Sequence, residues 1–75
     1  MPQLVSMSGA LAVRAFAKAG WVRVGQVGSH VMLSKPGVSI ILSVPQQRVL
    51  SVETLQALVS SADMTVEQFL FIGAI

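Results

Sequence analysis

The single histidine of this chain, His30, ends the short stretch "GQVGSH" that starts at Gly25. Imidazole suits the giving and taking of protons near neutral pH, because its unperturbed pKa is about 6.5. Gly28 lets another backbone approach closely, and the Ser29 hydroxyl or neighbouring backbone N–H groups can hold a phosphate. The stretch therefore has the residue types for proton transfer beside a phosphate. The alternative is a histidine that is merely structural or solvated.

Other kinds of chemistry have few residues to support them. The chain has no cysteine, which excludes disulfides and thiolate metal sites and is typical of an intracellular protein. Its three carboxylates are scattered, at Glu53, Asp63 and Glu67, so we expect neither a metal nor a cofactor. The formal net charge of +2 permits contact with nucleic acid without requiring it. The apolar share of 53% predicts exposed apolar surface that a partner covers.

The first element that must position His30 is a helix. Ser8 is a suitable N-cap, apolar residues recur at helical spacing over residues 9–19, and Gly20 suits the left-handed position after a helix. From residue 21 the apolar period changes to two. This change predicts a short strand around Val22 and Val24, followed by a turn at residues 26–28.

Two more strands are predicted next along the chain. Residues 29–34 form one strand and residues 38–44 another, and the Lys35-Pro36-Gly37 turn between them favours a tight reversal. Strands joined by tight turns form an antiparallel meander. Four residues of the third strand share one face and are expected in the core: Val38, Ile40, Leu42 and Val44.

The second half of the chain is predicted to be helical. Ser51 can cap a helix that ends near Ala62. Thr65 and Gln68 have the spacing of a capping box, in which each side chain satisfies a backbone N–H at a helix start. We therefore expect a last, short helix from about Val66.

The resulting order is α-β-β-β-α with a short final helix, in a single α+β domain over residues 1–75. A three-stranded antiparallel sheet with helices on one face leaves its other face open. If Val31 and Leu33 face the core, then His30 faces the open side. The other residues expected on that side are Met32, Ser34, Ser39, Ile41 and Ser43, of which Met32 and Ile41 would form an apolar patch near His30.

The location of the protein is expected to be cytoplasmic. Residues 1–7 lack the basic region and long apolar run of a signal peptide. No uncharged apolar stretch approaches the roughly 20 residues that span a membrane.

Several motifs together resemble the HicA toxin family, also called the YcfA-like family. They are "AKAGW" at the end of the first helix, "GSH" at the start of the second strand, "VP" at the end of the third, and "LSVETLQALVSSADMTVEQF". The resemblance covers roughly residues 8–70, and the order of the motifs is more specific than any one of them.

The resemblance implies a fold like that of double-stranded-RNA-binding domains and ribosome-independent cleavage of mRNA. It also implies a HicB-type antitoxin as the partner that neutralises the toxin. The histidine of the family's "GSH" motif is catalytic, and it corresponds to His30 here. No cofactor or metal is implied.

The sequence also departs from the family pattern. Many members have a second histidine after "VP", where this chain has Gln46 and Gln47, and a Gly-Thr-Leu-Arg run where this chain has Glu53 to Gln56. The family's usual glycine between the last two helices is Asp63. These differences predict a slow nuclease, and they leave open a catalytically weak or inactive RNA-binding or protein-interaction domain.

Basic residues are the candidates for holding the RNA backbone beside Gly28 and Ser29. Arg23 and Lys35 are the first of these, and Arg48 and Lys18 are further candidates. Lys35 has the alternative of simply flanking its turn in solvent. Trp21 is either a platform for a base or, following a helix-ending glycine, an anchor of the core.

Overall fold

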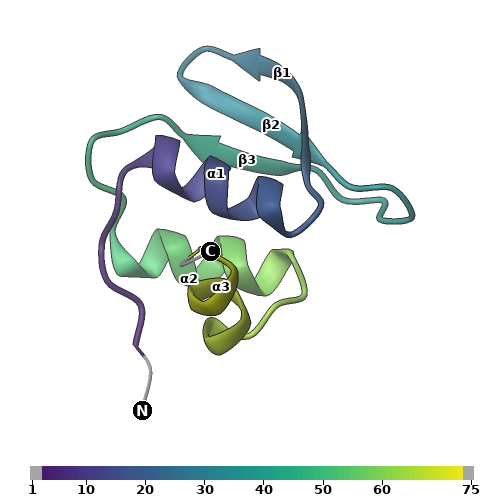
Figure 1. The fold of residues 1–75 in the computed structure, drawn as a ribbon. Helices are drawn as coiled ribbons and strands as arrows, with labels where there is room; N and C mark the ends of the chain where they lie inside the picture. The colour runs from purple at the N-terminus through teal and green to yellow at the C-terminus, as the bar shows by residue number, and fades with distance from the viewer. Residues whose placement is uncertain (1–2, 74–75) are drawn as a thin grey trace.

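The computed structural model describes residues 3–73 and contains three helices and three strands in that part of the chain (Figure 1). In chain order they are α1 (Gly9–Lys18), β1 (Val22–Val27), β2 (His30–Ser34), β3 (Leu42–Pro45), α2 (Val52–Ser61) and α3 (Val66–Gly73). The expected order of elements is therefore confirmed.

The ends of α1 are set by local hydrogen bonds and backbone angles. The Ser8 hydroxyl accepts a hydrogen bond from the Leu11 N–H at 3.1 Å, which satisfies one of the free donors at the helix start. Gly20 has φ +100°, the positive angle expected of the glycine that follows a helix. Both predictions from the sequence are confirmed.

The starts of α2 and α3 are capped as the sequence predicted. The Ser51 hydroxyl accepts a hydrogen bond from the Thr54 N–H at 3.2 Å. At the start of α3, the Thr65 N–H donates to Gln68 Oε1 at 2.9 Å and the Gln68 N–H donates to Thr65 Oγ1 at 3.1 Å. This reciprocal pair is a capping box. Asp63, in the turn between α2 and α3, has φ +57°, which explains why a glycine suits this position.

The sheet has the strand order β1-β2-β3, and both neighbouring pairs are antiparallel. The predicted turn at residues 26–28 is wrong, because Gln26 pairs with Val31 and Val27 pairs with His30 in β1. The connection is the two-residue turn Gly28–Ser29, and Gly28 has φ +57°. A glycine with positive φ at the first of two turn residues fits a type II′ hairpin turn.

The predicted start of the third strand at Val38 is also wrong, because β3 begins at Leu42. Leu33 pairs with Leu42, so the preceding residues form the connection between the strands and face no partner strand. Val38 and Ile40 accordingly stay exposed, at 38% and 42% of their surfaces, although the alternation predicted them in the core. Leu42 and Val44 are buried as expected.

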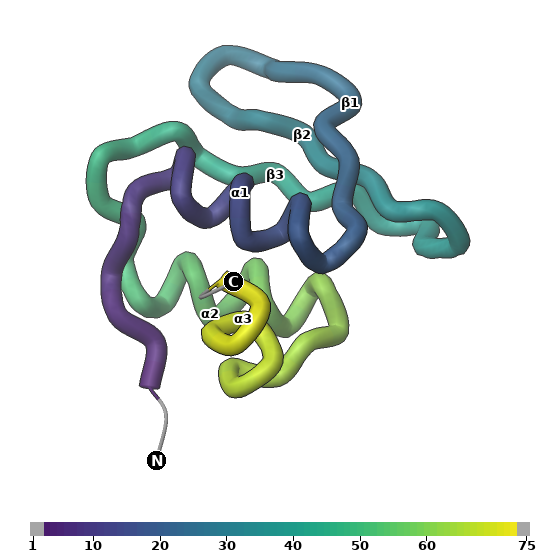
Figure 2. The backbone as a smooth tube through the Cα atoms, viewed as in Figure 1, coloured from purple at the N-terminus to yellow at the C-terminus, as the bar shows by residue number. Residues whose placement is uncertain are grey.

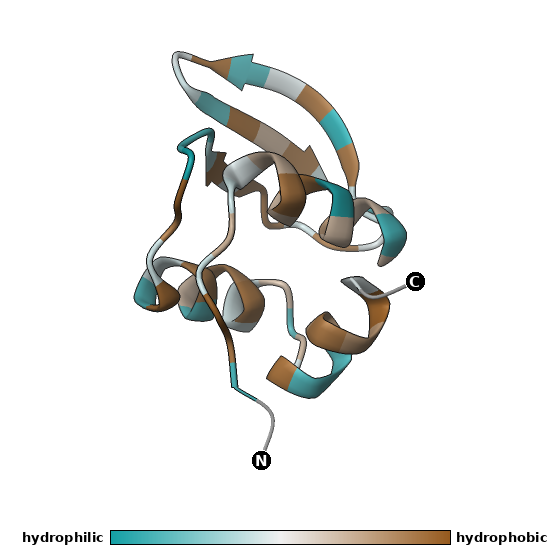
Figure 3. Cartoon of the chain, turned by 60° about the vertical axis from the view of Figure 1, so that its left-hand side comes forward, coloured by the Kyte–Doolittle hydropathy of each residue, from teal (hydrophilic) through white to brown (hydrophobic). Residues whose placement is uncertain are grey.

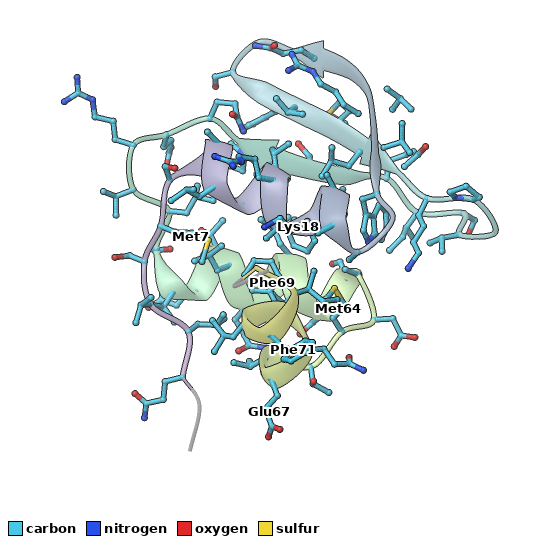
Figure 4. The ribbon with its side chains drawn as sticks, viewed as in Figure 1. Met7, Lys18, Met64, Glu67, Phe69 and Phe71 are labelled. Atoms are coloured by element: carbon cyan, nitrogen blue, oxygen red, sulfur yellow. The ribbon has the colours of Figure 1, made fainter. Side chains whose placement is uncertain are left out.

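One apolar core lies between the sheet and the helices. α1 and α2 contact β3, and α3 packs against α1 and α2 (Figure 1). The Phe16 ring of α1 and the Phe69 ring of α3 have centroids 5.0 Å apart, and Figure 4 shows Phe69 between these helices. The helices thus cover one side of the sheet, which is the predicted α+β fold of the double-stranded-RNA-binding-domain type.

The β1–β2 hairpin extends beyond the body of the helices (Figures 1 and 2). Every residue of β1 is exposed, whereas Val31 and Leu33 of β2 are buried. Figure 3 shows hydrophobic residues interrupted by hydrophilic ones along β1 and a largely hydrophobic α3. None of the helices in residues 3–73 is both long and apolar enough to cross a membrane.

Candidate functional site

His30 is the first residue of β2 and lies between the two outer strands of the sheet. Its cross-strand partners are Val27 in β1 and Pro45 in β3. Directly opposed residues of antiparallel strands point to the same side of a sheet. The next residue, Val31, is buried under the helices, with only 2% of its surface exposed. Because successive residues of a strand point to opposite sides, His30 points to the open side, and it is exposed. The face predicted for His30 is therefore confirmed.

The apolar neighbour of His30 on this face is Val27, which is 67% exposed. The sequence interpretation missed it, because it assigned Val27 to a turn. Met32, half-buried, pairs with Gly25 and Ser43. Ile41 lies before β3, at the opposite end of the strand from Pro45. Of the apolar patch predicted near His30, Met32 lies two residues from His30 along β2, whereas Ile41 lies just beyond the far end of β3.

The turn before His30 is supported from the β1 side by side-chain hydrogen bonds. The Gln26 side chain donates from Nε2 to the Gly28 carbonyl oxygen at 3.1 Å, and its Oε1 accepts from Arg23 Nη2 at 2.6 Å. The pairing shifts between Arg23 and Gly25, so that Arg23 opposes Leu33 and Gln26 opposes Val31. Both side chains therefore lie on the side of the sheet away from His30. The three residues joined by these hydrogen bonds, Arg23, Gln26 and Gly28, are all exposed.

The same turn is supported from the β3 side by backbone groups. The Gln46 N–H donates to the Ser29 carbonyl oxygen at 2.7 Å, one residue beyond the His30–Pro45 pair. The Gln46 side chain also donates from Nε2 to the carbonyl oxygen of Val44, two residues earlier, at 3.1 Å. The N–H of Gly9, the first residue of α1, donates to the Gln47 oxygen at 2.9 Å. The start of α1 therefore lies against the loop that supports the turn.

Lys35 stands at the far end of the sheet from His30. The two residues are five positions apart, which at about 3.3 Å per strand residue is roughly 16 Å. The Lys35 Cε atom is 3.3 Å from the place where a Cβ of Gly20 would be, just after α1. A lysine there is favourably placed beside the negative end of the helix dipole. The structure thus brings Gly28 and Ser29 to His30, but neither Arg23 nor Lys35.

Trp21 belongs to the core and is not a platform for a base. Only 2% of its surface is exposed, which rules out stacking on a nucleobase in this conformation. Its Nε1 has no hydrogen-bond partner among the described residues. Of the two interpretations of Trp21, the structure supports the core anchor.

A second proton-transferring side chain does not come from the loop after β3. Gln46 and Gln47 stand there, and an amide does not titrate near neutral pH. Within residues 3–73 there is no group of three or more His, Asp or Glu side chains that could hold a metal ion. On the open side of the sheet, His30 is therefore the candidate for acid–base chemistry.

A separate apolar groove of about 390 Å³ lies away from the sheet. Its lining comes from the segment before α1, from α1 and from α3: Val5, Ser6, Met7, Leu11, Ala15, Phe69, Leu70 and Gly73. Met7 and Phe69 are visible at this place in Figure 4, where Glu67 points away into solvent. The side chains that line this groove include no titratable group, so the groove is not a candidate for acid–base catalysis.

The structure therefore shows a small α+β domain, with a fold like that of double-stranded-RNA-binding domains and an exposed histidine at a strand start as one candidate acid–base residue. The family model described as the HicA toxin of bacterial toxin–antitoxin systems matches residues 11–64. Because this match spans more than half of the 75 residues, the chain belongs to the HicA toxin family. A comparison with curated proteins gave no match. The family resemblance inferred from the motifs is confirmed.

Proposed function

We propose that this member of the HicA toxin family acts as a ribosome-independent mRNA endonuclease with His30 as the general acid or base. The observation that carries this proposal is the placement of His30. It is exposed on the open side of the sheet, directly after the Gly28–Ser29 turn, and the helices cover the other side.

The reaction needs two proton transfers. A base removes the proton of a ribose 2′-hydroxyl, whose oxygen attacks the adjacent phosphorus. The bond from phosphorus to the 5′-oxygen breaks, and an acid protonates that oxygen, leaving a 2′,3′-cyclic phosphate and a 5′-hydroxyl. Imidazole can serve either transfer, but one histidine serves one at a time. Water supplies the other transfer, so we expect slow turnover.

Gly28 and Ser29 are the residues that we propose to contact the reacting phosphate. A Cβ at Gly28 would meet no atom within 4 Å, so the surface above the turn is open to a backbone from another molecule. Lys35 and Arg23 lie too far away or on the other side of the sheet for this phosphate. We propose that they contact phosphates farther along the RNA, which fits recognition of shape and backbone over sequence.

A HicB-type antitoxin is the proposed protein partner. Exposed valines flank the open side of the sheet, including Val22 at 54% and Val27 at 67%. Apolar surface of this kind is typical of a face that a partner covers. An antitoxin bound there would also block His30.

The test replaces His30 by alanine and follows both growth arrest and RNA cleavage after expression. We expect both to be lost, while the melting temperature stays that of the parent, because His30 is exposed. Gln56→Ala, an exposed position on α2 remote from the turn, is the matched control and should remain toxic. Unchanged toxicity of the His30 variant would overturn the assignment.

A second candidate function is binding without cleavage. It is favoured by the two amides of Gln46 and Gln47 where a second histidine would help, and by Glu53 where the family has glycine. An RNA-binding domain of this kind would show salt-dependent RNA binding but no cleavage products. A pure protein-interaction module, using the apolar open face of the sheet and the C-terminal tail, would bind no RNA at any salt concentration and would form a stable complex on size exclusion.

A further inference from the structure

We infer that the start of α1 positions His30, with Gly9 and Gln46 as positioning residues that do not touch the substrate. The inference rests on the proposed nuclease function for its effect on rate, but its structural effect can be measured without any activity. It starts from a contact between two segments that are far apart in the sequence.

Gly9 is buried against the loop that follows β3, with no room for a side chain. A Cβ on Gly9 would clash with the Pro45 carbonyl oxygen and would lie 2.9 Å from Gln46 Cα and 3.0 Å from Gln46 Nε2. The contacts with the Pro45 oxygen and with Gln46 Cα are to backbone, so rotating the Gln46 side chain would relieve only the contact with Nε2. The close approach of Gly9 to Pro45 and Gln46, together with the 2.9 Å hydrogen bond from the Gly9 N–H to the Gln47 oxygen, fixes this loop against α1.

The loop held in this way is joined directly to the Gly28–Ser29 turn that precedes His30. Pro45 is the cross-strand partner of His30, and the Gln46 N–H donates to the oxygen of Ser29, the residue before His30. Any side chain at position 9 would push Pro45 and Gln46 outward. This displacement would break or lengthen the 2.7 Å bond to Ser29 and turn the first residue of β2.

A helix that is anchored in the core thus sets the direction of an exposed side chain. α1 contributes Ala12 and Phe16, both 0% exposed, to the core, so its start cannot follow the loop if the loop moves. Because Gly9 contacts the loop and the loop is bonded to Ser29, the fixed position of α1 also restricts the movement of the turn. A nuclease with one proton-transferring residue depends strongly on the direction of that residue, because small misplacements cost large factors in rate.

The experiment compares Gly9→Ala with Gly73→Ala, a control whose added Cβ meets Ala15 Cβ at an ordinary 3.5 Å. His30 is the single histidine of the chain, so its imidazole Cε1–H group gives one ¹H–¹³C NMR signal that can be assigned without ambiguity. We expect Gly9→Ala to shift this signal and to lower kcat about tenfold to a hundredfold with little change in KM. Gly73→Ala should change neither.

A second pair of variants separates positioning from loss of fold. Gln46→Pro removes the N–H that bonds to Ser29, whereas Gln46→Ala keeps it and removes only the side chain. We expect the proline variant alone to shift the His30 signal and lower kcat, and this pair decides the matter if Gly9→Ala fails to fold. An unshifted His30 signal in folded Gly9→Ala, or equal signals in both Gln46 variants, overturns the inference. If the parent protein cuts no RNA but the signal shifts as expected, the proposed function fails and the positioning role stands.

Discussion

The two outer strands hold the same turn by different means. β1, with all six residues exposed, supports Gly28 through the Gln26 side chain, which in turn is bonded to Arg23. β3, with Leu42 and Val44 buried, leads into a loop that supports Ser29 through a backbone N–H and is packed on α1. The first support competes with water and side-chain motion, and the second can move only if a helix moves. We infer that the β3 side is the main support for the position of His30 and that the β1 side is the weaker support.

The largest expected difference between the two strands is in stability. Leu42→Ala should lower the free energy of unfolding by about 3 kcal/mol, because it opens a cavity under a side chain that is 2% exposed. Val24→Ala, at a β1 position that is 59% exposed, should change it by no more than about 0.5 kcal/mol. Urea denaturation monitored by Trp21 fluorescence measures both. Equal losses would show that β1 shares the core.

A smaller effect is expected at the turn itself. Gly28→Ala should lower the free energy of unfolding by about 1 kcal/mol, since its Cβ meets nothing within 4 Å and only the positive φ of 57° is costly. Asp63→Gly is the reciprocal control, because Asp63 has the same φ of 57° far from both outer strands, and it should stabilise the protein. A loss at Gly28 of several kcal/mol would mean that the turn is packed and not open.

The smallest effect is expected from the exposed support on β1. Gln26→Ala removes two exposed hydrogen bonds and should change the free energy of unfolding by less than about 1 kcal/mol. RNA cleavage should fall only severalfold, well short of the loss in Gly9→Ala. A single-turnover cleavage assay on both variants orders the two supports. A larger loss in Gln26→Ala than in Gly9→Ala would reverse the roles that we assign to β1 and β3.

Much of the candidate site was predictable from the sequence, and the parts that failed share one cause. The exposed side of His30 follows from the alternation with Val31 and Leu33, which needs only the period of a strand. The prediction that Arg23 and Lys35 lie beside His30 failed. To place these two residues, one must know where the pairing of β1 with β2 shifts and how long β2 is. Neither is encoded in a local pattern, because strand register depends on which distant residues fill the core.

The sequence by itself determined the helix ends and the face of the sheet on which the histidine lies. The caps at Ser8, Ser51 and Thr65 are hydrogen bonds between residues three apart, so they depend only on residues that are close in the sequence. Only the tertiary structure decided where β1 ends, where β3 begins, and that Gly9 lies against Pro45 and Gln46. These features join segments far apart along the chain, and packing of the whole core selects them.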